Sequence, residues 1–322
     1  MKRQWVGVLI GIGSVLFCSV VALGDQNEGL DAWEPLDPME MAITVDDLPA
    51  FGEIPPDMNR RDIGKGVLRA LESIHTPPVY GFSNAQQLTW APESLDVLKD
   101  WLQSGHFLGN HTFSHVNLAH STAEAYIADI VAMDGLLTYL SPLAPPVKVF
   151  RYPYMSEGDT VEKRDRVRNF LENKGYQVAQ VTVHYDDWAW NGAYVRCHAM
   201  NDKAQVQWLR QHVIAAARRE VRQAQKMAKL VAGRDVRHIL LLHVSAFNAL
   251  TLADVLAALQ ADGVKFIDLP RAMNDPIYRL NPGLSLSGGP TFLKQLIEAK
   301  NLAYPYGKQL YSIERIEAIC KR

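Results

Sequence analysis

From residue 41 onward, short apolar runs alternate with longer segments in which apolar residues recur at helical spacing. Short runs rich in β-branched and aromatic residues are typical of buried strands, whereas apolar positions recurring every three or four residues are typical of helices. Seven strands are predicted, at Met41–Asp46, Val79–Phe82, His106–Asn110, Val147–Tyr152, Gln177–Val183, Arg237–His243 and Val264–Leu269. Helices are predicted at Pro92–Ser104, Thr122–Leu140, Asp159–Lys174, Lys203–Ala232 and Leu252–Ala261.

The order of these elements predicts an α/β fold with a parallel sheet, and closure into a barrel is the natural arrangement at this length. No repeat or interdomain linker interrupts the pattern, so we expect one domain over residues 41–275, preceded by an N-terminal extension at 25–40. The alternation of predicted strands and helices ends after Pro276. Residues 276–322 are expected to be a C-terminal extension whose short helices, Leu293–Ala299 and Ile313–Ile319, pack on the outside.

The N-terminus has the layout of an export signal. Lys2 and Arg3 precede an apolar run from Trp5 to Leu23, and Ala22 and Gly24 place small residues at the positions that a signal peptidase reads. We therefore predict a signal peptide at residues 1–24 and an exported protein, periplasmic or extracellular. Because the apolar run is long for a signal core, an uncleaved membrane anchor is the alternative.

Composition narrows the class of protein further. Of the 322 residues, 48% are hydrophobic and 21% charged, which is typical of a globular chain and not of a disordered one. The net charge of −2 gives no general case for nucleic-acid binding, which normally needs a basic surface. After signal cleavage only Cys197 and Cys320 remain, and they are either bridged, as export would permit, or two buried thiols.

Polar residues gather where predicted strands end. Five of the seven strands end in, or run directly into, ionisable residues: Asp46-Asp47, His111 to His115, Arg151, His184 to Asp187, and His243. In a parallel α/β barrel the carboxyl ends of all strands converge on one face, where the chemistry takes place. Five such coincidences are hard to explain by core packing, so this rim is the predicted active site.

A metal site is predicted from residue types and spacing. His111 and His115 are four residues apart, so a helical turn after the strand would place both imidazoles on one side. A carboxylate from Asp46 or Asp47 would complete a set of two histidines and one carboxylate, which leaves room for water and substrate. Zinc suits these ligands, although cobalt, nickel or another divalent ion could serve. The alternative is that the two histidines only cap the following helix.

The remaining rim residues suggest acid–base chemistry. One of the paired aspartates can bind the metal while the other takes a proton from bound water. A nearby cation and Arg151 could hold both carboxylates charged. His243 is placed to protonate a leaving group, and Asp187 could orient its imidazole.

In this order, the five segments resemble the NodB-homology polysaccharide deacetylases, carbohydrate esterase family 4. The matching segments are Thr44-Val45-Asp46-Asp47, His111-Thr112-Phe113-Ser114-His115, Arg151-Tyr152-Pro153-Tyr154, Asp187-Trp188 and Leu241-Leu242-His243. The resemblance spans residues 41 to about 275 and implies a distorted (β/α)7 barrel.

By matching position, the resemblance implies a role for each residue of these segments. The implied metal ligands are Asp47, His111 and His115, and the implied general base is Asp46, tuned by Arg151. His243 would be the general acid, supported by Asp187. The backbone N–H of Tyr154 would help to stabilise the oxyanion, and Trp188 would wall the acetyl pocket. The implied reaction is metal-assisted hydrolysis of N-acetyl groups on an N-acetylglucosamine-type polysaccharide.

The segments also depart from the family pattern. Leu48-Pro49 replaces the usual glycine after the paired aspartates, and His184 stands where an outer aspartate is expected. These changes leave the ligands and proton-transfer groups in place but reshape the groove. The sequence therefore does not identify which polysaccharide is the substrate. Two other functions are considered: an amidase of the same fold acting on a small non-sugar amide, and a glycan-binding pseudoenzyme. Trp190 could stack on a sugar or belong to the core.

Overall fold

The computed structural model describes residues 36–141, 145, 147–286, 288–305 and 312–321, which all lie in one compact unit. Within them, seven parallel strands confirm the predicted number. They are β1 (Met39–Leu48), β2 (Tyr80–Ser83), β3 (Phe107–Asn110), β4 (Val149–Phe150), β5 (Gln177–Val178), β6 (His238–His243) and β7 (Val264–Ile267). The predicted signal peptide lies outside the described residues.

The strands pair in the order β5-β4-β3-β2-β1-β6, and β7 pairs with β1. Met41 and Ala42 of β1 pair with β6 on one side and with β7 on the other. Strand β7 therefore lies on the same side of β1 as β2, and it pairs with residues of β1 that precede those paired with β2. Beyond β5 the chain crosses from β4 to β6, because Ala179 still donates to β4 while Val183 pairs with Leu240. This crossing links the two ends of the strand order and gives the distorted (β/α)7 barrel that the sequence predicted.

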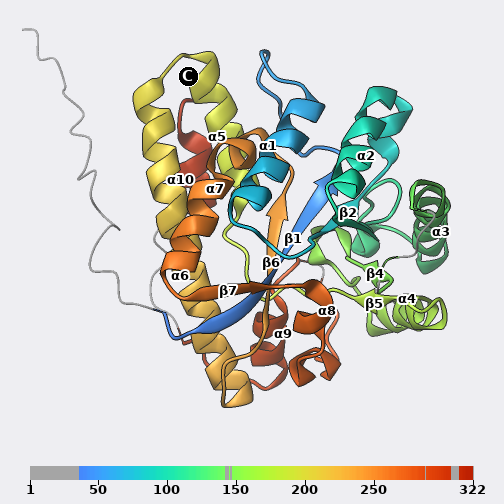
Figure 1. Cartoon of the computed structure of the whole chain (residues 1–322). Helices are drawn as coiled ribbons and strands as arrows, with labels where there is room; N and C mark the ends of the chain where they lie inside the picture. Colours follow the sequence, from blue (N-terminus) through green and yellow to red (C-terminus); the bar gives the residue numbers. More distant parts are fainter. Residues whose placement is uncertain (1–35, 142–144, 146, 287, 306–311, 322) are drawn as a thin grey trace, which may run out of the picture. The chain divides into compact units, whose positions relative to one another are not determined.

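The core explains why β1 and β6 are long apolar runs. Both strands are buried along almost their whole length, as expected for parallel strands covered on both faces. In Figure 1 they lie side by side at the centre, with α1 and α7 beside them. Thr44, a polar residue within this buried part of β1, is satisfied because its hydroxyl donates to the carbonyl oxygen of Leu240 at 2.6 Å.

Helices follow most strands. The α-helices are α1 (Arg60–Ser73), α2 (Leu95–Gln103), α3 (Ala123–Leu140), α4 (Val161–Asn173), α5 (Asp187–Ala199), α6 (Lys203–Ala232), α7 (Ala246–Ala261), α8 (Leu269–Met273), α9 (Phe292–Ala299) and α10 (Ile313–Ala318). Short 3-10 helices are η1 (Gln86–Thr89), η2 (Pro92–Ser94), η3 (Leu118–His120), η4 (Pro153–Met155) and η5 (Pro276–Arg279). The predicted bounds of the long helix α6 are confirmed. Thr122 is the cap of α3, since its hydroxyl accepts from the backbone N–H of Ala125 at 3.1 Å.

Three details differ from the sequence prediction. Helices α1, α5 and α8 were not predicted, and strands β4 and β5 are only two residues long. The third difference is the segment between His111 and His115, which is not helical. Thr112 and His115 have left-handed backbone angles, φ of 60° and 54°, that a helix would not contain.

The C-terminal extension packs on the outer helices, as predicted. Helix α9 contacts α6, and α10 contacts α5. A disulfide between Cys197 of α5 and Cys320 settles the choice that the sequence left open. Among the described residues, no helix has both the length and the apolar character needed to cross a membrane.

Candidate active site

A cavity of about 420 Å³ opens at the carboxyl ends of the strands. Most of its lining comes from β1, from β6 and from the segments that follow β1, β3, β4 and β5, so the predicted convergence of five strands is confirmed. The lining residues are Asp46, Asp47, Phe51, His111, His115, Tyr154, Met155, His184, Asp186, Asp187, Trp188, Leu241, His243 and Gly289.

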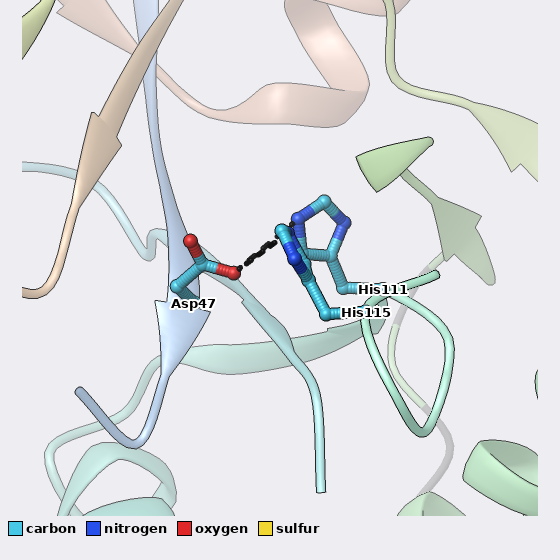
Figure 2. Close-up of side chains that lie close together, drawn as sticks. All are labelled: Asp47, His111 and His115. Atoms are coloured by element: carbon cyan, nitrogen blue, oxygen red, sulfur yellow. Dashed lines mark ion pairs between the residues drawn. The ribbon is translucent and has the colours of Figure 1, made fainter. Parts of the chain in front are cut away.

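Three of these side chains form a cluster of donor atoms. Asp47 at the end of β1 faces His111 and His115 from the loop after β3, and the carboxylate and both imidazoles point toward one another (Figure 2). Oδ1 of Asp47 lies 3.1 Å from Nε2 of His115 and 3.7 Å from Nε2 of His111. One ligand atom from each residue lies within 4.8 Å of the others, a spacing that one divalent ion could bridge.

Neighbouring groups orient this cluster for metal binding. Nδ1 of His111 lies 2.8 Å from the carbonyl oxygen of Arg151, which can only accept a hydrogen bond. The proton therefore sits on Nδ1, and the lone pair of Nε2 faces Asp47. Burial lowers the pKa of His111 well below its usual value, which keeps the ring neutral. Asn84 donates to Oδ1 of Asp47 at 2.7 Å and fixes the carboxylate. A neutral imidazole and an oriented carboxylate fit a divalent cation.

The two histidines meet through a tight turn and not through the predicted helical turn. The backbone N–H of Thr112 donates to the side chain of Asn110 at 2.9 Å, and that of Ser114 donates to Asp129 at 2.8 Å. These side-chain acceptors replace helical hydrogen bonds, and the left-handed residues fold the chain back. The rings of His111 and His115 end up 5.0 Å apart between centroids, so the predicted proximity is confirmed by a different geometry.

Asp46 is buried beside Arg151. The guanidinium Nη1 of Arg151 lies 3.3 Å from Oδ1 of Asp46, while Nε and Nη2 donate to the carbonyl oxygen of Ala179 and to Oγ1 of Thr44 at 2.6 and 3.0 Å. Arg151 is thus held on three sides and presents one edge to the carboxylate. Burial raises the pKa of Asp46 to about 7, although the positive charge of Arg151 lowers it in part. The predicted contact between the two side chains is confirmed.

His243 and Asp187 form a second pair. Nδ1 of His243 lies 2.8 Å from Oδ1 of Asp187, and Nε2 lies 4.0 Å from Oδ2 of Asp47. Burial lowers the pKa of His243, but the surrounding carboxylates, Asp187 foremost, outweigh it and raise this pKa to about 9. A charged imidazolium held at the end of β6 can give a proton to a group in the cavity.

Tyr154 and Trp188 both line the cavity. The ring of Tyr154 packs against His115, with centroids 4.6 Å apart, and its backbone is left-handed with φ of 58°. His184 is also there, with Nδ1 3.1 Å from Asp186. Trp190 is different: it is 1% exposed and stacks on Phe247, so it belongs to the core.

Besides Met155 and Gly289 of the cavity lining, three residues that contact site residues or line the cavity were not predicted from sequence. Asn84 orients Asp47, Asn248 donates to Oδ2 of Asp187 at 2.5 Å, and the ring of Phe51 lies 4.9 Å from that of His243. A signal existed for Asn84, since it follows Ser83 at the carboxyl end of β2, on the rim where the other site residues lie. Phe51 and Asn248 carry no such signal, because a loop phenylalanine and a helix asparagine are common anywhere.

Comparisons with known proteins show which family and relatives the chain is similar to. Residues 34–179 match the polysaccharide deacetylase family. Over 93 residues the chain is 30% identical to a peptidoglycan-N-acetylglucosamine deacetylase of Bacillus cereus, a match that covers 29% of this chain and 31% of that protein. Over 82 residues it is 30% identical to a chitin deacetylase of Arthroderma benhamiae, covering 26% and 22%. The matches therefore span less than a third of each relative.

The fold also matches a solved structure, a mutant of a carbohydrate esterase family 4 pseudoenzyme from Bacillus anthracis with restored enzymatic activity. The TM-score is 0.50 at 17% identity, over 75% of this chain and 69% of that one. This likeness concerns the fold alone. Asp187, Trp188 and His243 lie beyond the family-matched segment 34–179, so their place in the site comes from the structure of this chain.

Proposed function

We propose that the protein is a metal-dependent hydrolase that removes acetyl groups from an N-acetylglucosamine-type polysaccharide, and the match of residues 34–179 to the polysaccharide deacetylase family supports this proposal. One observation carries this proposal: a donor cluster, a carboxylate–arginine pair and a carboxylate–histidine pair meet at one cavity. These groups are Asp47 with His111 and His115, Asp46 with Arg151, and Asp187 with His243.

Asp47, His111 and His115 are assigned as ligands of a divalent ion. Two histidines and one carboxylate are typical of catalytic zinc sites, so zinc is the proposed ion. When bound, the ion supplies a Lewis acid beside the amide that is cleaved. The hydrogen bond from Asn84 to Asp47 and that between His111 and the Arg151 carbonyl support this assignment, because both fix ligands in the form a cation needs.

Asp46 and His243 are assigned to proton transfer. Asp46 takes a proton from the attacking water as the water oxygen bonds to the amide carbonyl carbon. Nε2 of His243 then gives a proton to the nitrogen as the carbon–nitrogen bond breaks, leaving acetate and a free amine. Arg151 holds Asp46 in place, and Asp187 holds the other ring nitrogen of His243.

Tyr154 and Trp188 are assigned to binding. The backbone N–H of Tyr154 would donate to the oxygen that gains negative charge during attack, and Trp188 would form an apolar wall for the acetyl methyl group. Both residues line the cavity beside the donor cluster, which supports these roles.

An activity assay on three polysaccharides identifies the substrate. The two relatives are named for peptidoglycan and for chitin, so both are candidate substrates, with poly-N-acetylglucosamine as a third. The purified chain should release acetate from at least one of them, and a chelator should abolish release. No acetate from any of the three, with metal shown to be bound, would overturn the proposal. Glycan binding under those conditions would then identify a non-catalytic binding protein.

Two variants separate the assigned roles. Asp46→Asn should lower turnover by about 10²- to 10⁴-fold, the usual contribution of a general base, and should keep the metal. Asp47→Asn should lose both turnover and bound metal, because it removes the carboxylate that binds the metal. Metal content is measured directly on each purified variant. Unchanged turnover in Asp46→Asn would overturn the assignment of the base.

Export is proposed as well, through the signal at residues 1–24. The Cys197–Cys320 disulfide supports it, because such bonds form and persist in oxidising compartments outside the cytosol. Cell fractionation, with N-terminal sequencing of the mature protein, tests both the compartment and the predicted cleavage before Asp25.

A further inference from the structure

The C-terminal extension reaches back into the active-site rim. Gly289 lines the cavity, although it lies more than a hundred residues beyond the family-matched segment. On its C-terminal side the backbone N–H of Phe292 donates to Val181 O at 2.7 Å, and the side chain of Gln295 donates to Pro290 O at 3.1 Å. On its N-terminal side the hydroxyl of Ser285 donates to Asp159 O at 3.3 Å. Gly289 is therefore held near the loops that follow β4 and β5.

Gly289 approaches the backbone of Tyr154 too closely for any side chain. A Cβ atom added to Gly289 would lie 1.8 Å from the carbonyl oxygen of Tyr154, and 2.8 Å from Cβ of Met155. Carbon atoms do not come this close to other atoms without displacement. The nearest obstacle is backbone and not the flexible end of a side chain, so a substitution at Gly289 must move one of the two segments.

The turn that Gly289 touches is conformationally demanding. Tyr154 and Met155 have φ of 58° and 51°, a left-handed conformation that residues other than glycine adopt at a cost. Within the turn, Met155 N donates to Tyr152 O at 3.0 Å and Ser156 N to Pro153 O at 3.1 Å. Such a conformation persists where the surroundings hold it. The backbone of Gly289 packs against one side of this turn.

We propose that Gly289 is a positioning residue, through which the C-terminal extension fixes the Tyr154 peptide at the cavity. This inference rests on the proposed function, in which the Tyr154 N–H stabilises the oxyanion. It assigns a role in the site to an extension whose helices α9 and α10 pack on the outer helices. The donor cluster comes from β1 and the loop after β3, so a move of the Tyr154 turn, whose ring packs on His115, leaves the backbone of all three ligands on their own elements.

The neighbouring glycine gives a matched control. No described atom lies within 4 Å of a Cβ placed on Gly288. Gly288→Ala and Gly289→Ala therefore make the same chemical change at adjacent positions. We expect Gly289→Ala to lower kcat for acetate release by about 10- to 100-fold through displacement of the oxyanion donor. KM and metal content should stay near their original values, and Gly288→Ala should match the unsubstituted chain in all three.

A second readout does not depend on activity. With selective isotope labelling of tyrosine, the backbone amide resonance of Tyr154 should shift in Gly289→Ala and stay in place in Gly288→Ala. Equal kcat and an unmoved Tyr154 resonance in Gly289→Ala would overturn the inference. If the unsubstituted chain releases no acetate, the proposed function fails instead, and the resonance still tests whether Gly289 positions the turn.

A substitution without a clash covers the case in which Gly289→Ala does not fold. Gln295→Leu keeps a side chain of similar size but removes the hydrogen bond to Pro290 O. A lowered kcat with intact metal content in this variant supports the positioning role. A kcat equal to that of the unsubstituted chain overturns it.

Discussion

Oδ1 of Asp187 lies 2.8 Å from Nδ1 of His243, and the other carboxylate oxygen accepts from two further donors. These donors are the backbone N–H of His243 at 2.7 Å and the side chain of Asn248 at 2.5 Å. Both oxygens of a buried carboxylate are thus committed, and the imidazole is fixed with Nδ1 as the protonated nitrogen. Nε2 is the nitrogen left to exchange a proton with a substrate.

Replacing Asp187 with asparagine should remove the carboxylate that orients the imidazole of His243, the proposed general acid. The introduced side chain would place an amide NH2 against one of the donors that Asp187 now accepts from, so the imidazole would lose its fixed orientation and tautomer. We expect kcat to fall by about 10²- to 10⁴-fold, the range for loss of general acid catalysis. Metal content should not change, because Asp187 is not in the donor cluster. Steady-state kinetics and metal analysis measure the two quantities.

Asp254→Asn is the control for this substitution. Asp254 pairs with Arg210 at the surface, where its side chain is 47% exposed, so the same chemical change there should leave kcat as it was. If Asp187→Asn and Asp254→Asn gave the same kcat, Asp187 would have no part in catalysis.

Most of the rim was predictable because it depends on strand ends alone. Apolar runs located β1, β3 and β6, and a parallel sheet places the carboxyl ends of its strands on one face. Asp47, His111 and His243 therefore had to come near one another whatever the loops did. The turn between His111 and His115 was not predictable in the same way, since it depends on side-chain acceptors, Asn110 and Asp129, that bond to its backbone.

Two of the helices that were not predicted, α5 and α1, lack the usual helical signals. Helix α5 is buried on nearly all sides, so its sequence has no polar face and no helical period. Helix α1 contains Gly64 and Gly66, which lower helix propensity. Both glycines sit where a Cβ would strike a neighbouring helix, Val97 of α2 and Ala249 of α7. Close packing, which a sequence pattern does not display, overrides local preference here.

The stability of the fold should depend on pH through His106. Nδ1 of His106 accepts from the backbone N–H of Val79 at 3.2 Å, and its ring packs on Trp101. Burial lowers the pKa of His106 to about 4, below the value near 6.5 of an unfolded histidine. Between these two values the unfolded chain binds a proton that the folded chain does not, so unfolding becomes easier as pH falls. This contribution is complete above about pH 6.5 and is lost toward pH 4.

Urea unfolding of the chain and of His106→Asn, at pH 7 and at pH 5, isolates this contribution. Carboxylates titrate in both proteins, so only the difference between them reports His106. We expect the unsubstituted chain to lose more free energy of unfolding between the two pH values than the variant does. Equal losses in the two proteins would show that folding does not lower the pKa of His106.

Two helix glycines should respond in opposite directions to the same substitution. A Cβ on Gly66 of α1 would lie 2.6 Å from Cβ and 3.1 Å from Cα of Ala249 in α7, so Gly66→Ala must push two packed helices apart. We expect a loss of about 1–3 kcal/mol in the free energy of unfolding, the usual cost of overpacking. Gly135 of α3 is exposed and no described atom lies within 4 Å of its added Cβ. There the better helix propensity of alanine should act alone and raise stability by about 0.5–1 kcal/mol. Urea unfolding of both variants measures these changes, and a Gly66→Ala chain as stable as Gly135→Ala would show that α1 and α7 do not pack this closely.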